Sequence, residues 1–164
     1  MDWLERTFSY ALVLSWWQQI GLAFLLGSFT VATLSDLKRL SAQREFVEVW
    51  LLFILGMLLF EIYDVHSQGA DVTRLAVKWG LIALLSLLSF WRVGVFFRLA
   101  AADVAALAAA ASLLTPTPIL IFYGIARMIA WVAEKTLAAG RPYYPFMPVV
   151  SLATLCVLVL GLFS

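Results

Sequence analysis

Apolar stretches long enough to cross a lipid bilayer occupy most of this chain, and they constrain its fold more than any other feature. A helix needs about 20 mostly apolar residues to span the hydrocarbon core, and backbone polar groups in lipid must be satisfied within helices or closed barrels. The 164 residues are 64% hydrophobic and 13% charged, whereas soluble domains carry roughly a quarter charged residues. The sequence therefore predicts an all-α polytopic membrane protein.

Six apolar segments qualify as membrane-spanning helices. Their predicted limits are about residues 12–34, 46–63, 75–91, 95–114, 119–136 and 149–163. The fourth segment ends at the "TPTP" stretch of residues 115–118, because proline cannot continue a helix interior. The connections are short, so residues 1–164 are predicted to form a single bundle of six transmembrane helices.

Basic residues in the short connections predict the orientation of the bundle. One side of the membrane carries seven of them, Lys38, Arg39, Arg44, Arg92, Arg98, Lys135 and Arg141. The other side carries three, Arg6, Arg74 and Lys78. The richer side is assigned to the cytoplasm, which places both termini outside and makes this a multi-pass protein of the cytoplasmic membrane.

One carboxylate, Asp103, lies inside the alanine-rich fourth segment. An ionisable group at membrane depth costs roughly 2.5–3.5 kcal/mol on insertion scales, and it is usually buried and functional. On a helix, Asp103 shares a face with Ala100, Ala106 and Ala110, and small side chains let another helix approach closely. The alternative is a tightly packed helix whose aspartate only bonds to a neighbour.

A second carboxylate, Asp36, follows the first segment. The predicted topology places Asp36 and Asp103 on the cytoplasmic side at similar depth, and Asp64 and Asp71 on the opposite side. Two adjacent carboxylates share a proton near neutral pH, so one can accept a proton from water while the other donates to a scissile carbonyl. Alternatively, Asp36 caps a short interfacial helix or lies in a solvated loop.

The remaining polar residues offer no competing chemistry. The single His66 is predicted on an outer loop and the single Cys156 in the last segment, so neither a nucleophilic pair nor a His/Cys metal site is expected. No cofactor is expected either, and the net charge of +1 does not indicate nucleic-acid binding. Arg127 lies in the middle of the fifth segment, where we expect an ion pair with Glu48 or Glu61.

In these features the sequence resembles the type IV prepilin peptidase family, aspartic membrane proteases that include archaeal preflagellin peptidases. The resemblance is carried by "SDLKRLSAQREFVEVW" at residues 35–50, by "AAAD" at residues 100–103, where the family has a GxGD motif, and by "RPYYPFMPV" at residues 141–149. It implies that Asp36 and Asp103 are the catalytic residues. The residues expected to shape the site or bind substrate are Ala100, Ala102, Glu48, Pro145 and Pro148.

The resemblance implies an endopeptidase that removes the short basic leader, a class III signal peptide, from type IV pilin-like or archaellin-like precursors at the cytoplasmic membrane face. The precursor and the lipid bilayer would be its partners. Ala100 replaces a glycine of the motif, and a Cβ there could narrow substrate access or force different backbone angles. The zinc-binding cysteine pairs and the N-methylation domain of many bacterial members are missing, as in the short archaeal form.

Three alternatives stay open at this point. The chain could be a catalytically inactive homologue, for which Ala100 is the argument. It could be another GxGD-type protease in which the "YD" at Tyr63 and Asp64 pairs Asp64 with Asp103. It could also be a small ion- or proton-coupled transport protein, an interpretation favoured if Asp103 pairs with Arg127 and Asp36 lies away from both.

Overall fold

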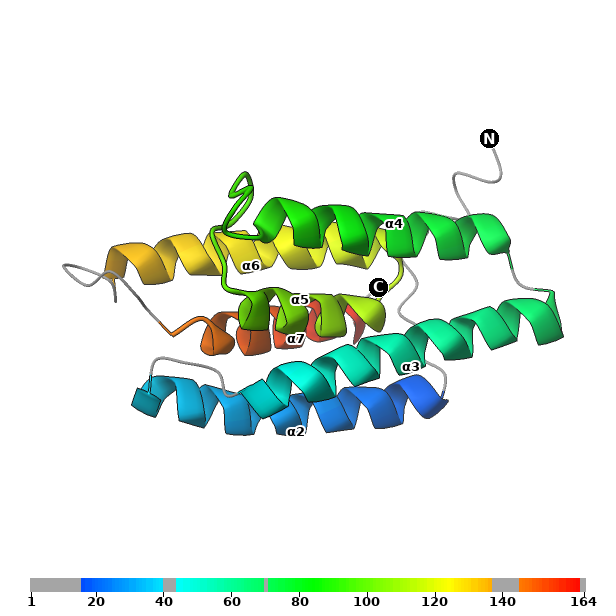
Figure 1. The fold of residues 1–164 in the computed structure, drawn as a ribbon, viewed down its shortest axis with the longest axis horizontal. Helices are drawn as coiled ribbons and strands as arrows, with labels where there is room; N and C mark the ends of the chain where they lie inside the picture. Colours follow the sequence, from blue (N-terminus) through cyan, green and yellow to red (C-terminus); the bar gives the residue numbers. More distant parts are fainter. Residues whose placement is uncertain (1–15, 40–43, 70, 137–144, 163–164) are drawn as a thin grey trace.

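The computed structural model describes residues 16–39, 44–69, 71–136 and 145–162. Within these ranges the chain is all-α and forms six helices, each antiparallel to the one before it (Figure 1). The helices are α2 (Trp16–Arg39), α3 (Arg44–Gln68), α4 (Val72–Ser89), α5 (Ala101–Ser112), α6 (Pro116–Thr136) and α7 (Met147–Leu162).

Because helix direction alternates, the helix ends gather at two ends of the bundle. One end, called the Asp103 end below, holds the last turns of α2, α4 and α6 and the first turns of α3, α5 and α7 (Figure 1). The opposite end holds the short connections from α3 to α4 and from α5 to α6.

Four of the described helices are long and apolar enough to cross a membrane, which fits a multi-pass membrane protein. These spans are Trp16–Ser35, Glu45–Ser67, Val72–Ser89 and Pro116–Thr136. Helices α5 and α7 are apolar but shorter. At 1.5 Å per residue α5 is about 18 Å long and α7 about 24 Å, less than the hydrocarbon thickness of about 30 Å.

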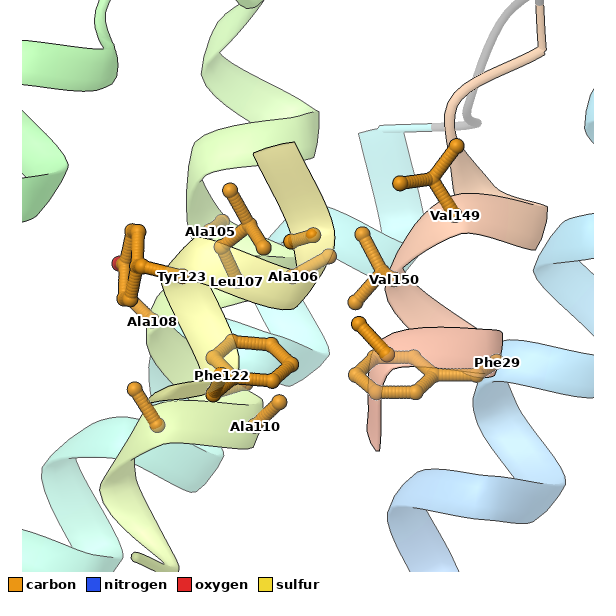
Figure 2. Packing of buried hydrophobic residues seen from close by; sticks show 14 of the residues in the cluster. Phe29, Ala105, Ala106, Leu107, Ala108, Ala110, Phe122, Tyr123, Val149 and Val150 are labelled. Carbon is orange, nitrogen blue, oxygen red and sulfur yellow. The ribbon is translucent and has the colours of Figure 1, made fainter. Parts of the chain in front are cut away.

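Helix α5 lies at the centre of the bundle. It packs against α3, α4, α7 and α2, and every residue from Ala105 to Ser112 is buried. Figure 2 shows Ala106 and Ala110 beside Phe122 of α6, with Val150 of α7 nearby. The alanine-rich segment is therefore the packing axis of the fold.

The alanines of α5 are buried in the interior, whereas many large apolar side chains of the other helices face outwards. Ala106 and Ala109 are 0% exposed, but Leu52 and Leu59 of α3 are 69% and 57% exposed. Small residues let membrane helices approach closely, and a large exposed apolar surface is a liability in water. This distribution suits a bundle surrounded by lipid.

Aromatic rings line the contact between α2 and α3. Ring centroids lie 5.6 Å apart in Trp17–Phe60, 5.9 Å in Phe24–Phe53 and 5.6 Å in Phe29–Trp50. The buried Trp50 indole also donates a hydrogen bond to Ser28 Oγ at 3.1 Å. Toward the end opposite Asp103, the rings of Trp17, Phe24, Phe53 and Phe60 border an apolar groove of about 430 Å³ between the two helices.

The fourth helix begins later than the sequence predicts. Helix α5 starts at Ala101, not at Val95, and ends at Ser112. Residues 90–100, called loop 90–100 below, are not helical but join α4 to α5 in a folded loop. Apolar composition alone does not distinguish these two conformations.

Backbone hydrogen bonds hold loop 90–100 in place. Leu99 N donates to Ser89 O at 3.1 Å, and Trp91 N donates to Leu99 O at 3.1 Å. Gly94 has φ +57, a left-handed conformation that glycine adopts without strain. Several backbone groups of the loop are thus satisfied within the loop or by the last residues of α4, as buried or membrane-embedded segments require.

Candidate functional site

Asp103 lies in the first turn of α5, at the end of the bundle named after it. Ala100 is the N-cap residue, and Val104 N donates to Ala100 O at 3.2 Å. Asp103 is therefore the third helical residue, where the positive end of the helix dipole stabilises a carboxylate. Its side chain is half-buried, so it lies at the boundary between the core and the end of the bundle.

The backbone at Ala100 does not require a glycine. Ala100 has φ −69 and ψ 162, an extended conformation that alanine adopts as readily as glycine. Ala100 is exposed and Ala102 is half-buried. Small side chains thus occupy the start of α5.

The fold brings the position of Asp36 to the same end as Asp103. Asp36 lies in the last turn of α2, and α2 contacts α5; the Asp36 side chain lies outside the described residues. Asp64, near the end of α3, and Asp71, which caps α4, lie at the opposite end. The helix order therefore separates Asp64 from Asp103, against the "YD" alternative.

The other residues expected to shape the site also lie at this end. Glu48 is an exposed residue in the second turn of α3. Pro145 is half-buried just before α7, and Pro148 is the second residue of that helix, a position where proline breaks no helical hydrogen bond. Residues 141–144 of the proline-containing segment lie outside the described part of the chain.

Loop 90–100 is tied to the rest of the Asp103 end by aromatic contacts. Phe97 and Phe146 are buried, and their ring centroids lie 5.8 Å apart. Phe96 contacts Tyr123 of α6, with centroids 6.4 Å apart. These contacts hold the segment that leads into Asp103 against both α6 and α7.

Arg127 has a different partner from the one the sequence predicts. Its Nη1 lies 3.5 Å from Glu134 Oε1, and its side chain is 42% exposed. Its guanidinium also lies over the Phe97 ring, 5.7 Å from the centroid. Because this pair is half-exposed, Arg127 does not require a buried carboxylate as its partner. Glu61, one of the two predicted partners, instead forms an ion pair with Lys78.

Sequence reasoning missed the pair of Lys78 and Glu61. Lys78 was assigned to the outer surface as a basic topology signal, but the structure buries it in α4 against Glu61 of α3. A signal was present: the two residues lie almost equally far from Gly69, on either side of the turn between their helices. An antiparallel helical hairpin brings such positions together.

The chemistry available at the Asp103 end is that of carboxylates. Among the described residues there is no group of three or more His, Cys, Asp or Glu side chains arranged to hold a metal ion. Two acids on neighbouring helices can perform general acid–base chemistry if they share a proton. Asp36 and Asp103 lie at the same end of the bundle, on helices that contact each other.

Comparisons with known proteins do not assign the chain to a family. No protein-family model, no curated protein and no solved structure matches it.

Proposed function

We propose that this chain is a membrane aspartic endopeptidase, similar to the type IV prepilin peptidases, that removes a short basic leader from pilin-like precursors. The observation that carries the proposal is the arrangement of two acids. Asp36 in the last turn of α2 and Asp103 in the first turn of α5 lie at one end of the bundle, on helices that contact each other.

In the proposed reaction the two aspartates share one proton. The ionised carboxylate accepts a proton from water, and the protonated one donates to the carbonyl of the scissile peptide bond. Because such a pair titrates as a unit, its pKa values belong to the pair and not to either residue. Ala100 and Ala102 leave room for an extended peptide beside α5, while Glu48, Pro145 and Pro148 border the site.

The proposed membrane arrangement has six spans with both termini outside. The Asp103 end then faces the cytoplasm, where a basic leader is held by the positive-inside rule. The short helices α5 and α7 do not span the membrane by themselves in this arrangement. Each crosses it together with its flanking segments, which for α5 include loop 90–100. The partners are the precursor protein and the lipid bilayer.

The test is cleavage of a prepilin with a class III leader in membranes that contain the protein. Asp36→Asn and Asp103→Asn should each abolish the leader-sized shift, because an amide can neither accept nor share the catalytic proton. Asp64→Asn is the matched control, since it makes the same chemical change at the opposite end. It should cleave like the wild type.

Three results would overturn the proposal. One is wild-type protein that cleaves no member of a panel of class III leaders. A second is full activity in either of the two Asp→Asn variants. The third is loss of activity in Asp64→Asn with retention in Asp36→Asn, which would favour the pairing of Asp64 with Asp103.

A further inference from the structure

A buried polar cluster lies at the far end of α5 from Asp103. Lys78 of α4 donates hydrogen bonds to Glu61 Oε1 and, at 2.6 Å, to Ser112 O. The Trp79 indole donates to Glu61 Oε2 at 2.8 Å. The Lys78 and Glu61 side chains are only 8% and 15% exposed. Three helices thus meet at one ion pair.

The ion pair lies well inside the candidate membrane spans. Lys78 follows Val72 by six residues, which places it about 9 Å from the start of α4. Isolated charges at such depth are expensive, and they persist in membranes when paired or when bonded to backbone carbonyls. Lys78 has both kinds of partner.

The last four carbonyls of α5 explain why the Lys78 ammonium is needed as a hydrogen-bond donor at the end of this helix. A helix leaves these four without an intrahelical partner, and in lipid each unsatisfied group costs several kcal/mol. Each has a donor. They are Ser112 Oγ for Ala109 O, Leu113 N for Ala110 O, Leu114 N for Ala111 O, and Lys78 Nζ for Ser112 O.

The fourth of these bonds differs from the others because its donor comes from another helix. The bonds from Ser112, Leu113 and Leu114 move with α5, whereas Lys78 belongs to α4 and is held by Glu61 of α3. A cation at a helix C-terminus also faces the negative end of the helix dipole. Lys78 therefore ties the end of α5 to two full-length helices.

We propose that Lys78, held by Glu61, is a positioning residue that fixes the membrane depth of α5 and thereby of Asp103 at its other end. Helix α5 has 12 residues and contains no glycine or proline, so a shift at Ser112 moves Asp103 with it. The consequence for cleavage rests on the proposed function. The consequence for helix depth does not.

The depth of α5 can be measured without any activity. Cys156 is the single cysteine of the chain, so Cys156→Ser provides a background for a nitroxide label at exposed Ala101. The label's relative accessibility to oxygen and to a water-soluble nickel chelate reports its depth in vesicles. In Lys78→Met the Ser112 carbonyl loses its donor, and a shift of α5 toward the nearer membrane surface would let water hydrogen-bond to it. This shift should move the label at the other end of α5 deeper into the bilayer by about 1 Å or more.

Further variants distinguish the loss of the hydrogen bond to Ser112 O from the effect of burying an unpaired charge. Lys78→Met leaves Glu61 unpaired, but the double variant Lys78→Met/Glu61→Met removes both charges and still leaves Ser112 O without its donor. The label should be deeper in the double variant too, and it should return to wild-type depth in Lys78→Arg, which keeps a donor. Lys135→Met, which removes an exposed cation from α6, is the matched control.

Cleavage kinetics test the functional half of the proposal. Lys78→Met should lower kcat by about 10- to 100-fold, as small displacements of a catalytic group do, with KM little changed and Lys78→Arg restoring kcat. A label at wild-type depth in the double variant would overturn the positioning role, as would unchanged kcat despite a displaced label. If the wild type cleaves nothing, the proposed function fails. The label measurement then still tests whether Lys78 fixes the membrane depth of α5.

Discussion

The ring of Phe97 meets the ring of Phe146 edge to face, with centroids 5.8 Å apart and planes at 78°. The two residues are far apart in sequence: Phe97 belongs to loop 90–100, and Phe146 immediately precedes α7. Each ring is 4% exposed. This contact fixes the segment that delivers the chain to Asp103.

We expect Phe97→Ala and Phe146→Ala each to lower the free energy of unfolding by about 3 kcal/mol, because each removes a buried ring and leaves a cavity. The double variant should lose less than the sum of the two by about 0.5–1.5 kcal/mol, the range for aromatic pairs. Helical circular dichroism during unfolding in mixed detergent micelles measures both quantities. Pairing Phe97→Ala with Leu52→Ala, on the lipid-facing side of α3, should give additive losses.

A larger side chain at the packing axis should disturb the bundle. Ala106 is 0% exposed, so Ala106→Leu forces α5 away from its neighbours and should cost about 1–3 kcal/mol. Ala101→Leu makes the same change on the same helix at an exposed position, and it should be nearly neutral. Equal thermal stability of the two variants in detergent would contradict the close packing of α5.

Two small substitutions in loop 90–100 should have different effects on stability. Gly94 has φ +57, and an added Cβ would lie 3.0 Å from Arg98 Cγ, so Gly94→Ala should destabilise by about 1 kcal/mol or more. Ala100→Gly should change stability by less than about 0.5 kcal/mol, because φ is −69 there. It should not raise proteolytic activity either. A large gain in cleavage would show that the Ala100 side chain obstructs the site.

Labelling with a membrane-impermeant maleimide should place the two ends of the bundle on opposite sides of the membrane. In the Cys156→Ser background, His66→Cys should react in intact cells, and Arg92→Cys should react only after permeabilisation. Both native residues are exposed. Reaction of both in intact cells would contradict the antiparallel order of α3 and α4. The reverse pattern would place Asp103 on the outer face and remove the basis for cleavage of cytoplasmic leaders.

Within the part of the chain that the structure describes, the number and order of the helices could be predicted from the sequence, because apolar segments of membrane-spanning length allow few other structures. The start of α5 could not. The stretch from Val95 to Leu99 is as apolar as a span, and its conformation depends on a left-handed glycine at position 94 and on backbone bonds to α4. Those are tertiary contacts that hydropathy does not register.

The candidate site, too, could be predicted from the sequence only in part. The alternation of helices brings Asp36 and Asp103 to one end, as the sequence predicts. The partner of Arg127 could not be predicted, because it depends on the direction in which a long side chain extends along its own helix toward Glu134. Lys78 lies near the end of the predicted segment 75–91, so it has the same sequence signature as a headgroup-facing lysine, and only the register between α3 and α4 distinguishes the two.

We expect the two flanks of the bundle to differ in mechanical stiffness. The buried alanines of α5 leave little side-chain freedom with which to absorb a displacement, so we expect α5 to move together with the helices packed against it. Between α2 and α3 the contact is made by rings beside an open groove, and rings can tilt without losing all of their contact. Under the proposed function, we therefore expect an entering polypeptide to displace the rings at the contact between α2 and α3, beside the helix that carries Asp36, more easily than the close-packed α5.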